Sequence, residues 1–166
     1  DSSGCIAISN ASITEPDVLE IVSISSDSAQ CYGQTDGFVY VSVNGGTPTY
    51  NFNWSFGGTN ANTNAPAGLH TVNITDNNGC VVDSMISVEQ PNEILATFTK
   101  DSVSCLGLSD GWAMASVTGG TNSFSYLWSN GSTQNNIINL CANSYNLTIT
   151  DTVGCTIDTT IIIGSQ

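Results

Sequence analysis

Apolar residues alternate with small polar residues along most of this chain, a period of two that is typical of strands with one buried face. The segment 50–54 shows the pattern clearly: Tyr50, Phe52 and Trp54 share one face and two asparagines take the other. Gly-Gly, Asp-Gly and Asn-Gly pairs interrupt the alternation where turns are expected. Helical periodicity is almost absent. We therefore predict an all-β protein.

Four motifs occur twice in the same order, 74 or 75 residues apart, which defines an internal repeat. Each repeat opens with Cys-x-Gly-x-x-Asp-Gly, continues through Gly-Gly-Thr and Trp-Ser, and closes with Thr-Asp-x-x-Gly-Cys. The paired segments are 30–37 with 104–111, 45–47 with 119–121, 54–55 with 128–129, and 75–80 with 150–155.

The first residues repeat the closing element, because Asp1-Ser2-Ser3-Gly4-Cys5 stands 75 residues ahead of Cys80. The prediction is a tandem of Ig-like β-sandwich repeats with an extra N-terminal strand. Residues 1–16 would be the last strand of a preceding repeat or an exchanged strand, residues 17–91 would form β-sandwich repeat 1, and residues 92–166 would form β-sandwich repeat 2.

These motifs resemble the SprB-type repeat, a module found in many copies in large surface adhesins of gliding Bacteroidota. The resemblance covers essentially the whole chain. Two departures stand out: repeat 1 has Phe56-Gly57-Gly58 after Trp54-Ser55, and the usual Ala-Gly-x-Tyr becomes Ala67-Gly68-Leu69-His70 and Cys141-Ala142-Asn143-Ser144-Tyr145. The resemblance implies adhesion, secretion through the type IX route and no catalysis.

The charge balance narrows the possible partners. The chain has a formal net charge of −13. Lys100 is its single lysine, and the chain has no arginine. Such a surface repels phosphates, so nucleic acid and anionic membranes are excluded as partners. No apolar run reaches the ~20 residues of a membrane span. Six cysteines without a CxxC pair indicate an oxidising compartment, so we expect an extracellular, cell-surface protein.

Four large side chains are predicted on the outer face of the strands that follow each Asp-Gly. Val39, Val41 and Val43 should face inward, as should Ala113, Ala115 and Val117. That phase sends Phe38, Tyr40, Trp112 and Met114 outward. Either a loop covers them, or they form a contact surface for a neighbouring module or a sugar.

The polar candidates have structural interpretations. His70 is expected at the edge of the core, in phase with Val72 and Ile74. The aspartates at turns are expected to cap backbone amides: Asp36, Asp76, Asp110 and Asp151. So acidic a chain could bind calcium, but it has no dense Asp-x-Asp-x-Asp cluster. No metal and no cofactor are therefore expected.

Repetition of an opening and a closing cysteine favours two intradomain disulfides, Cys31–Cys80 and Cys105–Cys155, among fifteen possible pairings. Each would close a loop of about 50 residues and contribute roughly 2–4 kcal/mol. Cys5 and Cys141 remain. They could bond to each other within one chain or between successive chains, or Cys5 could pair with an upstream repeat.

The leading segment and several short motifs suggest assembly and modification. A lone strand exposes unpaired backbone groups, so residues 1–16 could add to a module of another copy or pack on their own chain. The acceptor pattern for O-glycosylation in Bacteroidota, Asp-Ser/Thr followed by an apolar residue or Thr, offers five candidates: Ser28, Ser102, Thr152, Ser84 and Thr159. Ser28 and Ser102 are the best placed, whereas the phase of Ser84 and Thr159 points inward.

Three functions compete. The first is a structural or adhesive module of a surface fibre, with other copies of itself or adjoining repeats as partners. The second is a carbohydrate-binding module that stacks glycans on outward aromatics such as Trp112. The third is an enzyme, which the placement of the aspartates in turns, the lack of arginine and the single histidine argue against. We expect no catalysis.

Overall fold

The computed structural model describes residues 9–104, 107–121 and 123–165. Its strands fall into two groups of six, here called repeat 1 and repeat 2, and no helix occurs in these ranges. Repeat 1 contains β1 (Glu20–Asp27), β2 (Gly37–Asn44), β3 (Asn51–Trp54), β4 (Thr63–Ala65), β5 (Gly68–Thr75) and β6 (Val81–Val88). Repeat 2 contains β7 (Leu95–Asp101), β8 (Gly111–Thr118), β9 (Phe124–Trp128), β10 (Asn136–Leu140), β11 (Asn143–Asp151) and β12 (Thr156–Ile163). The predicted all-β fold is confirmed.

Each repeat is a sandwich of two three-stranded antiparallel sheets, and the two repeats share one strand order. In repeat 1 the sheets are β1-β2-β4 and β3-β5-β6. In repeat 2 they are β7-β8-β10 and β9-β11-β12. The repeated motifs thus mark repeated positions in space, which explains why their spacing is nearly constant.

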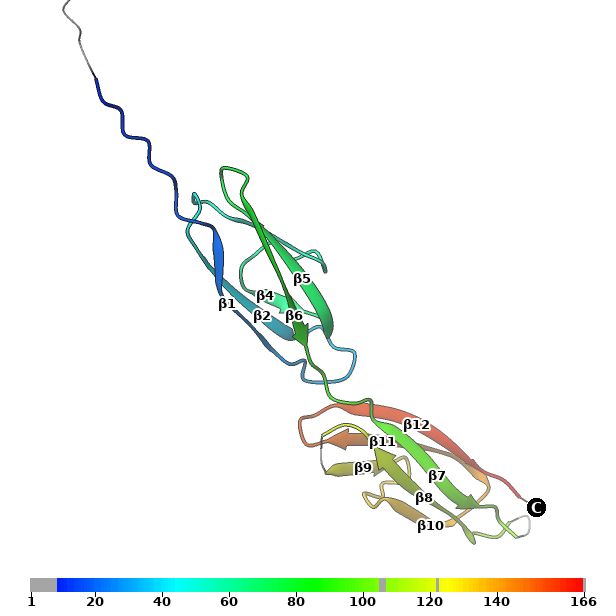
Figure 1. Cartoon of the computed structure of the whole chain (residues 1–166). Helices are drawn as coiled ribbons and strands as arrows, with labels where there is room; N and C mark the ends of the chain where they lie inside the picture. The colour runs from blue at the N-terminus through cyan, green and yellow to red at the C-terminus, as the bar shows by residue number, and fades with distance from the viewer. Residues whose placement is uncertain (1–8, 105–106, 122, 166) are drawn as a thin grey trace, which may run out of the picture.

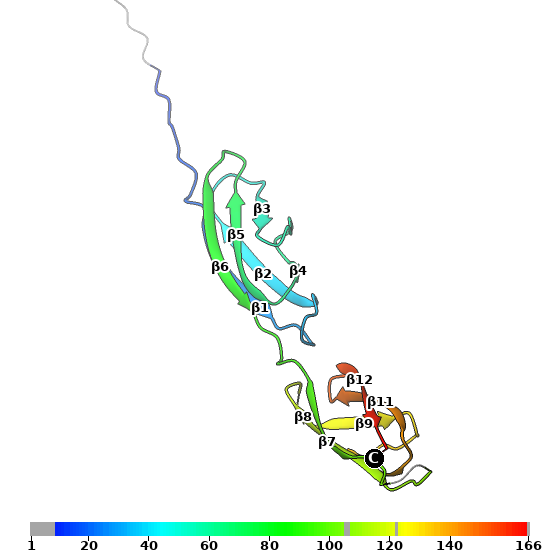
Figure 2. The same ribbon diagram turned by 90° about the vertical axis from the view of Figure 1, so that its right-hand side faces the viewer.

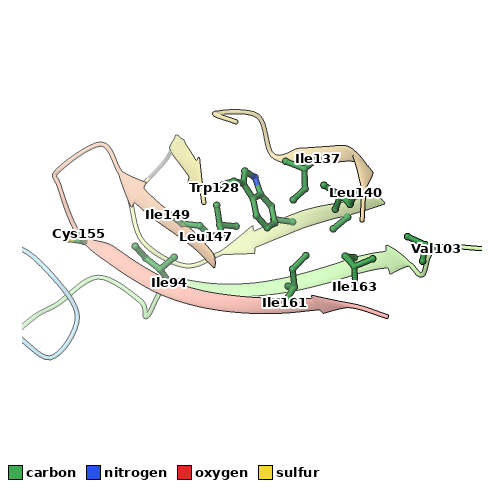
Figure 3. Close-up of a cluster of buried hydrophobic side chains, with 12 residues drawn as sticks. Ile94, Val103, Trp128, Ile137, Leu140, Leu147, Ile149, Cys155, Ile161 and Ile163 are labelled. Carbon is green, nitrogen blue, oxygen red and sulfur yellow. The ribbon is translucent and has the colours of Figure 1, made fainter. Parts of the chain in front are cut away.

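The core of each sandwich follows the predicted alternation. Val39 and Val41 are buried in repeat 1, as are Ala113 and Ala115 in repeat 2. Trp54 and Trp128 lie at the centre of the two cores, and the aromatics two and four residues before each tryptophan pack against them. Figure 3 shows Trp128 between the two sheets of repeat 2, with Leu147 and Ile161 beside it.

The two sandwiches lie end to end (Figures 1 and 2), joined by the short segment 89–94 between β6 and β7. Residues 9–18 project from the far end of repeat 1, as Figure 1 shows. They are exposed and belong to no strand. The predicted extra strand therefore does not pair with its own chain over residues 9–16, and the first eight residues of that segment lie outside the described ranges.

Candidate functional site

The joint between the repeats holds the disulfide of the structure, which links Cys31 of repeat 1 to Cys155 of repeat 2 with their Cα atoms 5.6 Å apart. Cys31 lies in the loop after β1, and Cys155 follows the turn between β11 and β12. Figure 3 shows the buried Cys155 at the end of repeat 2, next to the loop of repeat 1. This cross-link is between modules, not within one.

The predicted intradomain pairs Cys31–Cys80 and Cys105–Cys155 are therefore wrong. Cys80 is a free, exposed cysteine, and Cys155 is already bonded to Cys31. The physical reason is the length of β1. Its eight residues span about 26 Å and separate the end of the sandwich that holds Cys80 from the end that holds Cys31. A disulfide tolerates at most about 7 Å between Cα atoms.

The remaining cysteine predictions stay predictions. Cys141 is free and exposed, with its Sγ 3.0 Å from Oγ of Ser109. Cys5 and Cys105 lie outside the described residues, so a bond between Cys5 and Cys141 is not tested.

Hydrogen bonds hold the loop after β1 of repeat 1 against repeat 2 and the connecting segment. Nε2 of Gln30 donates to the carbonyl of Val153 at 2.8 Å. The amide of Gly33 donates to Oε1 of Gln90 in the connecting segment, also at 2.8 Å. A hollow of about 300 Å³ remains at this joint, and we call it the joint hollow. Its lining comes from the loop (Cys31, Tyr32 and Gln34), from the connecting segment (residues 92–94) and from repeat 2 (Gly120, Asp151 and residues 154–157).

A buried aspartate organises the closing turn of each repeat. Asp76 accepts hydrogen bonds from the amides of Asn78 and Cys80 through Oδ1 and from the amide of Thr47 through Oδ2, at 2.7–2.9 Å. The Thr47 amide lowers the pKa of Asp76 below its usual 3.8; burial opposes this shift, and the other two amides reinforce it. The carboxylate thus holds two turns together as an anion.

Asp151 does the same work in repeat 2. Its Oδ1 accepts from the amides of Val153 and Cys155, and its Oδ2 accepts from the amide and the hydroxyl of Thr121. Burial raises the pKa of Asp151, but the hydrogen bonds from Cys155 and Thr121 outweigh it, so the pKa is lowered overall. The predicted capping role of both aspartates is confirmed.

The opening turns use their aspartates in the same way. Oδ1 of Asp36 accepts from the amide of Gln30, and Oδ1 of Asp110 accepts from the amide of Ser104, both at 3.1 Å. The hydroxyl of Ser104 also bonds Asp110 and lowers its pKa. These carboxylates are bound to local backbone, as the turn motif predicted.

His70 is a core-edge residue, as its strand phase predicted. It is buried, and its Nε2 lies 2.7 Å from the carbonyl oxygen of Pro66. Its ring meets the edge of Phe56 at a centroid distance of 4.9 Å. Among the described residues, no group of three or more His, Cys, Asp or Glu side chains is arranged to hold a metal ion.

The predicted outer-face residues divide into two exposed and two half-buried side chains. Tyr40 and Met114 are exposed, whereas Phe38 and Trp112 are half-buried. Phe38 and Tyr40 pack with ring centroids 4.8 Å apart, and the hydroxyl of Tyr40 donates to Asp27 at 2.8 Å. That hydrogen bond raises the pKa of Tyr40. These four residues lie at equivalent positions on two modules and form no common site.

The glycosylation candidates differ in accessibility. Ser28 is exposed in the loop after β1, and Thr152 is exposed, with its hydroxyl donating to the carbonyl of Thr121 at 2.9 Å. The other three candidates, Ser84, Ser102 and Thr159, are half-buried.

Comparison with known families matches the same two modules. The sequence profile of the SprB repeat matches residues 23–59 and again residues 97–133. The two matches are offset by 74 residues, as the motifs are. Each begins within the first strand of its repeat and runs past the tryptophan turn.

Solved structures resemble the chain only distantly. Three N-terminal domains of the outer capsid protein Hoc of bacteriophage RB49 match with 17% identity and a TM-score of 0.42, covering 88% of this chain and 59% of that one. A 282-residue fragment of intimin, in complex with the intimin-binding domain of its receptor Tir, matches with 13% identity and a TM-score of 0.44, covering 87% and 64%. The four N-terminal Ig domains of Dscam1 isoform 9.44 match with 8% identity and a TM-score of 0.39, covering 93% and 47%. The chain spans about half to two thirds of the length of these structures.

Two further findings complete the comparison. The sequence has no significant match among curated proteins. Among the described residues, no helix is long and apolar enough to cross a bilayer. The family match, the constant offset and the shared strand order agree with one another. The chain therefore carries an SprB-type repeat module in each of its two sandwiches.

Proposed function

We propose that this chain is a structural and adhesive module of an extracellular surface fibre. The observation that carries the proposal is the joint, in which Cys31 and Cys155 lock two sandwiches end to end. A disulfide between modules sets their alignment and persists in an oxidising space outside the cytoplasm. SprB repeats occur in surface-exposed adhesins, which agrees with this location.

Assembly is proposed to run head to tail. Residues 9–16 are exposed and pair with no sheet, although they match the sequence that ends a repeat. An edge strand such as β12 exposes one row of unpaired backbone groups to which a strand of another copy can add. Strand addition would bury the exposed side chain of Ile13 and satisfy both rows of backbone groups.

The polar side chains support a non-catalytic function. Asp76 and Asp151 accept three and four hydrogen bonds from the closing turn and the Gly-Gly-Thr turn of their repeats, and both ring nitrogens of His70 lie near neighbouring oxygens. A general acid or base needs a free lone pair or proton directed at a substrate. These groups are committed to the fold.

O-glycosylation belongs to the same proposal, because a sugar coat would protect a fibre with a hydroxyl- and amide-rich surface. Ser28 is the strongest candidate, since it is exposed in a loop, and Thr152 is second. Peptide mass mapping of the native protein tests this point: an excess over the calculated mass on the peptide that carries Ser28 supports it. A Ser28 peptide found only at its unmodified mass contradicts it.

The surface-fibre function is tested on native cells. An antibody against the folded chain should label filaments on the outside of intact cells in electron microscopy, and a deletion strain should lose both the filaments and attachment to surfaces. Labelling confined to the cell interior would contradict the proposal.

A second candidate is carbohydrate binding, and the pair Phe38–Tyr40 favours it. The exposed face of Tyr40 lies beside the carboxylate of Asp27, and glycan sites combine an aromatic face with such acceptors. A glycan array probed with the single chain tests this function. Binding that is lost in Tyr40→Ser and in Trp112→Ser supports it, whereas filament formation without glycan binding favours the structural function.

A further inference from the structure

Repeat 1 has a counterpart of the joint hollow at its far end, and no residue among those that the structure describes fills it. We call this second site the front hollow; its volume is about 380 Å³. Cys80 occupies the place that Cys155 takes in the joint hollow. The lining consists of residues 15–19, Gly46, Asp76, Cys80 and Val81.

The two hollows are built by the same contacts. The amide of Gly46 donates to the carbonyl of Asp17 at 2.6 Å, as that of Gly120 does to Asn92 at 2.9 Å. Asp76 bonds the amide of Cys80 at 2.8 Å, as Asp151 bonds that of Cys155 at 2.9 Å. The joint hollow is closed on one side by the loop that carries Cys31, whereas no such loop lines the front hollow within residues 9–104, 107–121 and 123–165, and Cys80 is exposed there.

We propose that the front hollow binds the opening loop of repeat 2 from a second copy of this chain, with Cys80 disulfide-bonded to Cys105 of that copy. By sequence, Cys105 is the counterpart of Cys31, although it lies outside the described residues. The inference rests on the proposed fibre function and names the covalent link within it. The bond cannot form inside one chain, because the turn that precedes Cys80 and the loop between β7 and β8 lie at opposite ends of the molecule (Figure 1).

The side chains that line the front hollow favour the opening loop of repeat 2 over that of repeat 1 as the bound partner. Val18 and Val81 are 83% and 60% exposed there, and they replace Glu93 and Thr156 of the joint hollow. The front hollow is thus the more apolar of the two, and leaving two large aliphatic groups in water is unfavourable unless a partner covers them.

The opening loops of the two repeats differ in polarity in the same way as the two hollows do. The loop of repeat 1 carries Tyr32 and Gln34, which line the polar joint hollow. The loop of repeat 2 carries Leu106 and Leu108 at the same positions, and Leu108 is 47% exposed. An apolar loop thus matches the apolar hollow, which favours repeat 2 of another copy over repeat 1 as the partner.

One polar contact of the joint is not repeated. Ser104 stands in place of Gln30 and bonds Asp110 of its own turn, so it cannot reach across as Gln30 does to Val153. The link between copies therefore depends on apolar burial and on the disulfide itself. We expect it to be weak under reducing conditions and permanent once oxidised.

The covalent step is a thiol–disulfide exchange with an external disulfide, such as oxidised glutathione in vitro. The thiolate of Cys80 attacks that disulfide and releases one thiol; the thiolate of Cys105 then attacks the mixed disulfide and releases the second. Two protein thiols are oxidised, and one small disulfide is reduced to two thiols.

The test uses the full chain, purified reduced and then oxidised with a mixture of reduced and oxidised glutathione. We expect a ladder on a non-reducing gel that collapses on reduction. Chymotryptic mapping should yield a peptide pair that joins Cys80 to Cys105. Cys80→Ser should abolish the ladder, whereas the matched control Cys141→Ser, at the other free and exposed cysteine, should keep it.

A second variant keeps both thiols and tests the hollow. Val18→Asp combined with Val81→Asp should slow ladder formation at least tenfold, because it places carboxylates against Leu108, whereas Met85→Asp on the outer face of β6 should not change the rate. A ladder that persists in Cys80→Ser, or mapping that joins Cys80 to Cys141, overturns the inference. If filaments are present on cells but Cys80 remains free for alkylation, the proposed function stands and this inference alone fails.

Discussion

At the scale of single residues, one aspartate in each repeat stabilises the fold of that repeat through hydrogen bonds to backbone amides. The chain has a single lysine and no arginine, so salt bridges cannot stabilise the fold. Asp76 and Asp151 instead serve as anchors for backbone amides, and each connects the closing turn of its repeat to the Gly-Gly-Thr turn. Their lowered pKa values make this contribution dependent on pH.

The expected result is a loss of stability in acid. A folded pKa below the unfolded value of 3.8 means that the stabilisation is present above about pH 4 and is lost as the pH falls through the folded pKa. Thermal unfolding followed by circular dichroism from about pH 7 to pH 2 measures it. Asp76→Asn combined with Asp151→Asn should be less stable at pH 7 and should lose less stability in acid than the wild type.

A control variant separates the effect of charge repulsion between carboxylates from the effect of the hydrogen bonds that Asp76 and Asp151 accept from the turns. Protonation of the other carboxylates relieves the repulsion of a net charge of −13 and acts in the opposite direction. Asp83→Asn, an exposed strand position, removes one charge and no turn contact, so its acid profile should follow that of the wild type. Parallel profiles for the wild type and the double variant would contradict the anchoring function.

Trp128 should dominate the stability of repeat 2. It is 1% exposed, its Nε1 donates to the carbonyl of Gln134 at 2.9 Å, and Phe98 meets its ring edge. Trp128→Ala should cost about 3–5 kcal/mol of unfolding free energy, because it empties the centre of the core. Leu127→Ala, whose side chain is exposed on the opposite face, should cost less than about 0.5 kcal/mol. Urea unfolding measures both.

At the scale of elements, the sequence predicted the strands far better than it predicted the cross-link. Period-two alternation assigns each side chain to a face without knowledge of the partner strand, so the inward valines and tryptophans could be identified. The position of His70 and the capping aspartates followed from the same phase and from turn chemistry. These features depend on neighbours that are close in sequence or fixed by the pleat.

The pairing of Cys31 with Cys155 depends instead on which end of a sandwich each cysteine occupies. Counting one opening and one closing cysteine per repeat suggested a pair within the repeat. An opening cysteine that follows a strand of eight residues cannot reach a closing cysteine beside the start of that strand. The length of the first strand therefore argues against a pair within the repeat, whereas the symmetry of the motifs alone favours one.

Removal of the cross-link should loosen the joint and leave the sandwiches intact. Cys31→Ser combined with Cys155→Ser cuts no bond within a sheet, so the far-ultraviolet circular dichroism should be unchanged. The thermal midpoint of each repeat should fall by less than about 5 °C. Small-angle scattering should show a broader range of distances between the repeats, because hydrogen bonds such as those of Gln30 and Gly33 then hold the joint without a covalent link.

The matched control is Cys141→Ser, which removes a cysteine outside the joint. It should scatter as the wild type does. A double variant with unchanged scattering would show that the connecting segment, residues 89–94, fixes the alignment without the disulfide.

At the scale of the whole molecule, the chain has two different ends and one joint between its two repeats. One end presents the exposed tail and the front hollow, and the other presents the opening loop of repeat 2. In the proposed assembly, such polarity would let copies join in one direction only and continue without limit. A chain with one lysine and no arginine also offers few cleavage sites to proteases that cut after basic residues.

The disulfide of the joint also decides how the molecule carries mechanical load. Tension applied at the two chain ends passes from the first strand through Cys31 and Cys155 to the last strand, and it bypasses everything between these cysteines. They stand 124 positions apart, so an oxidised molecule pulled to failure should lengthen by about 400 Å less than a reduced one. Force spectroscopy with and without reductant measures this difference; equal lengths would contradict it. Only β1 and β12, both at sheet edges, bear the load directly, and the strands between the two cysteines carry none of it.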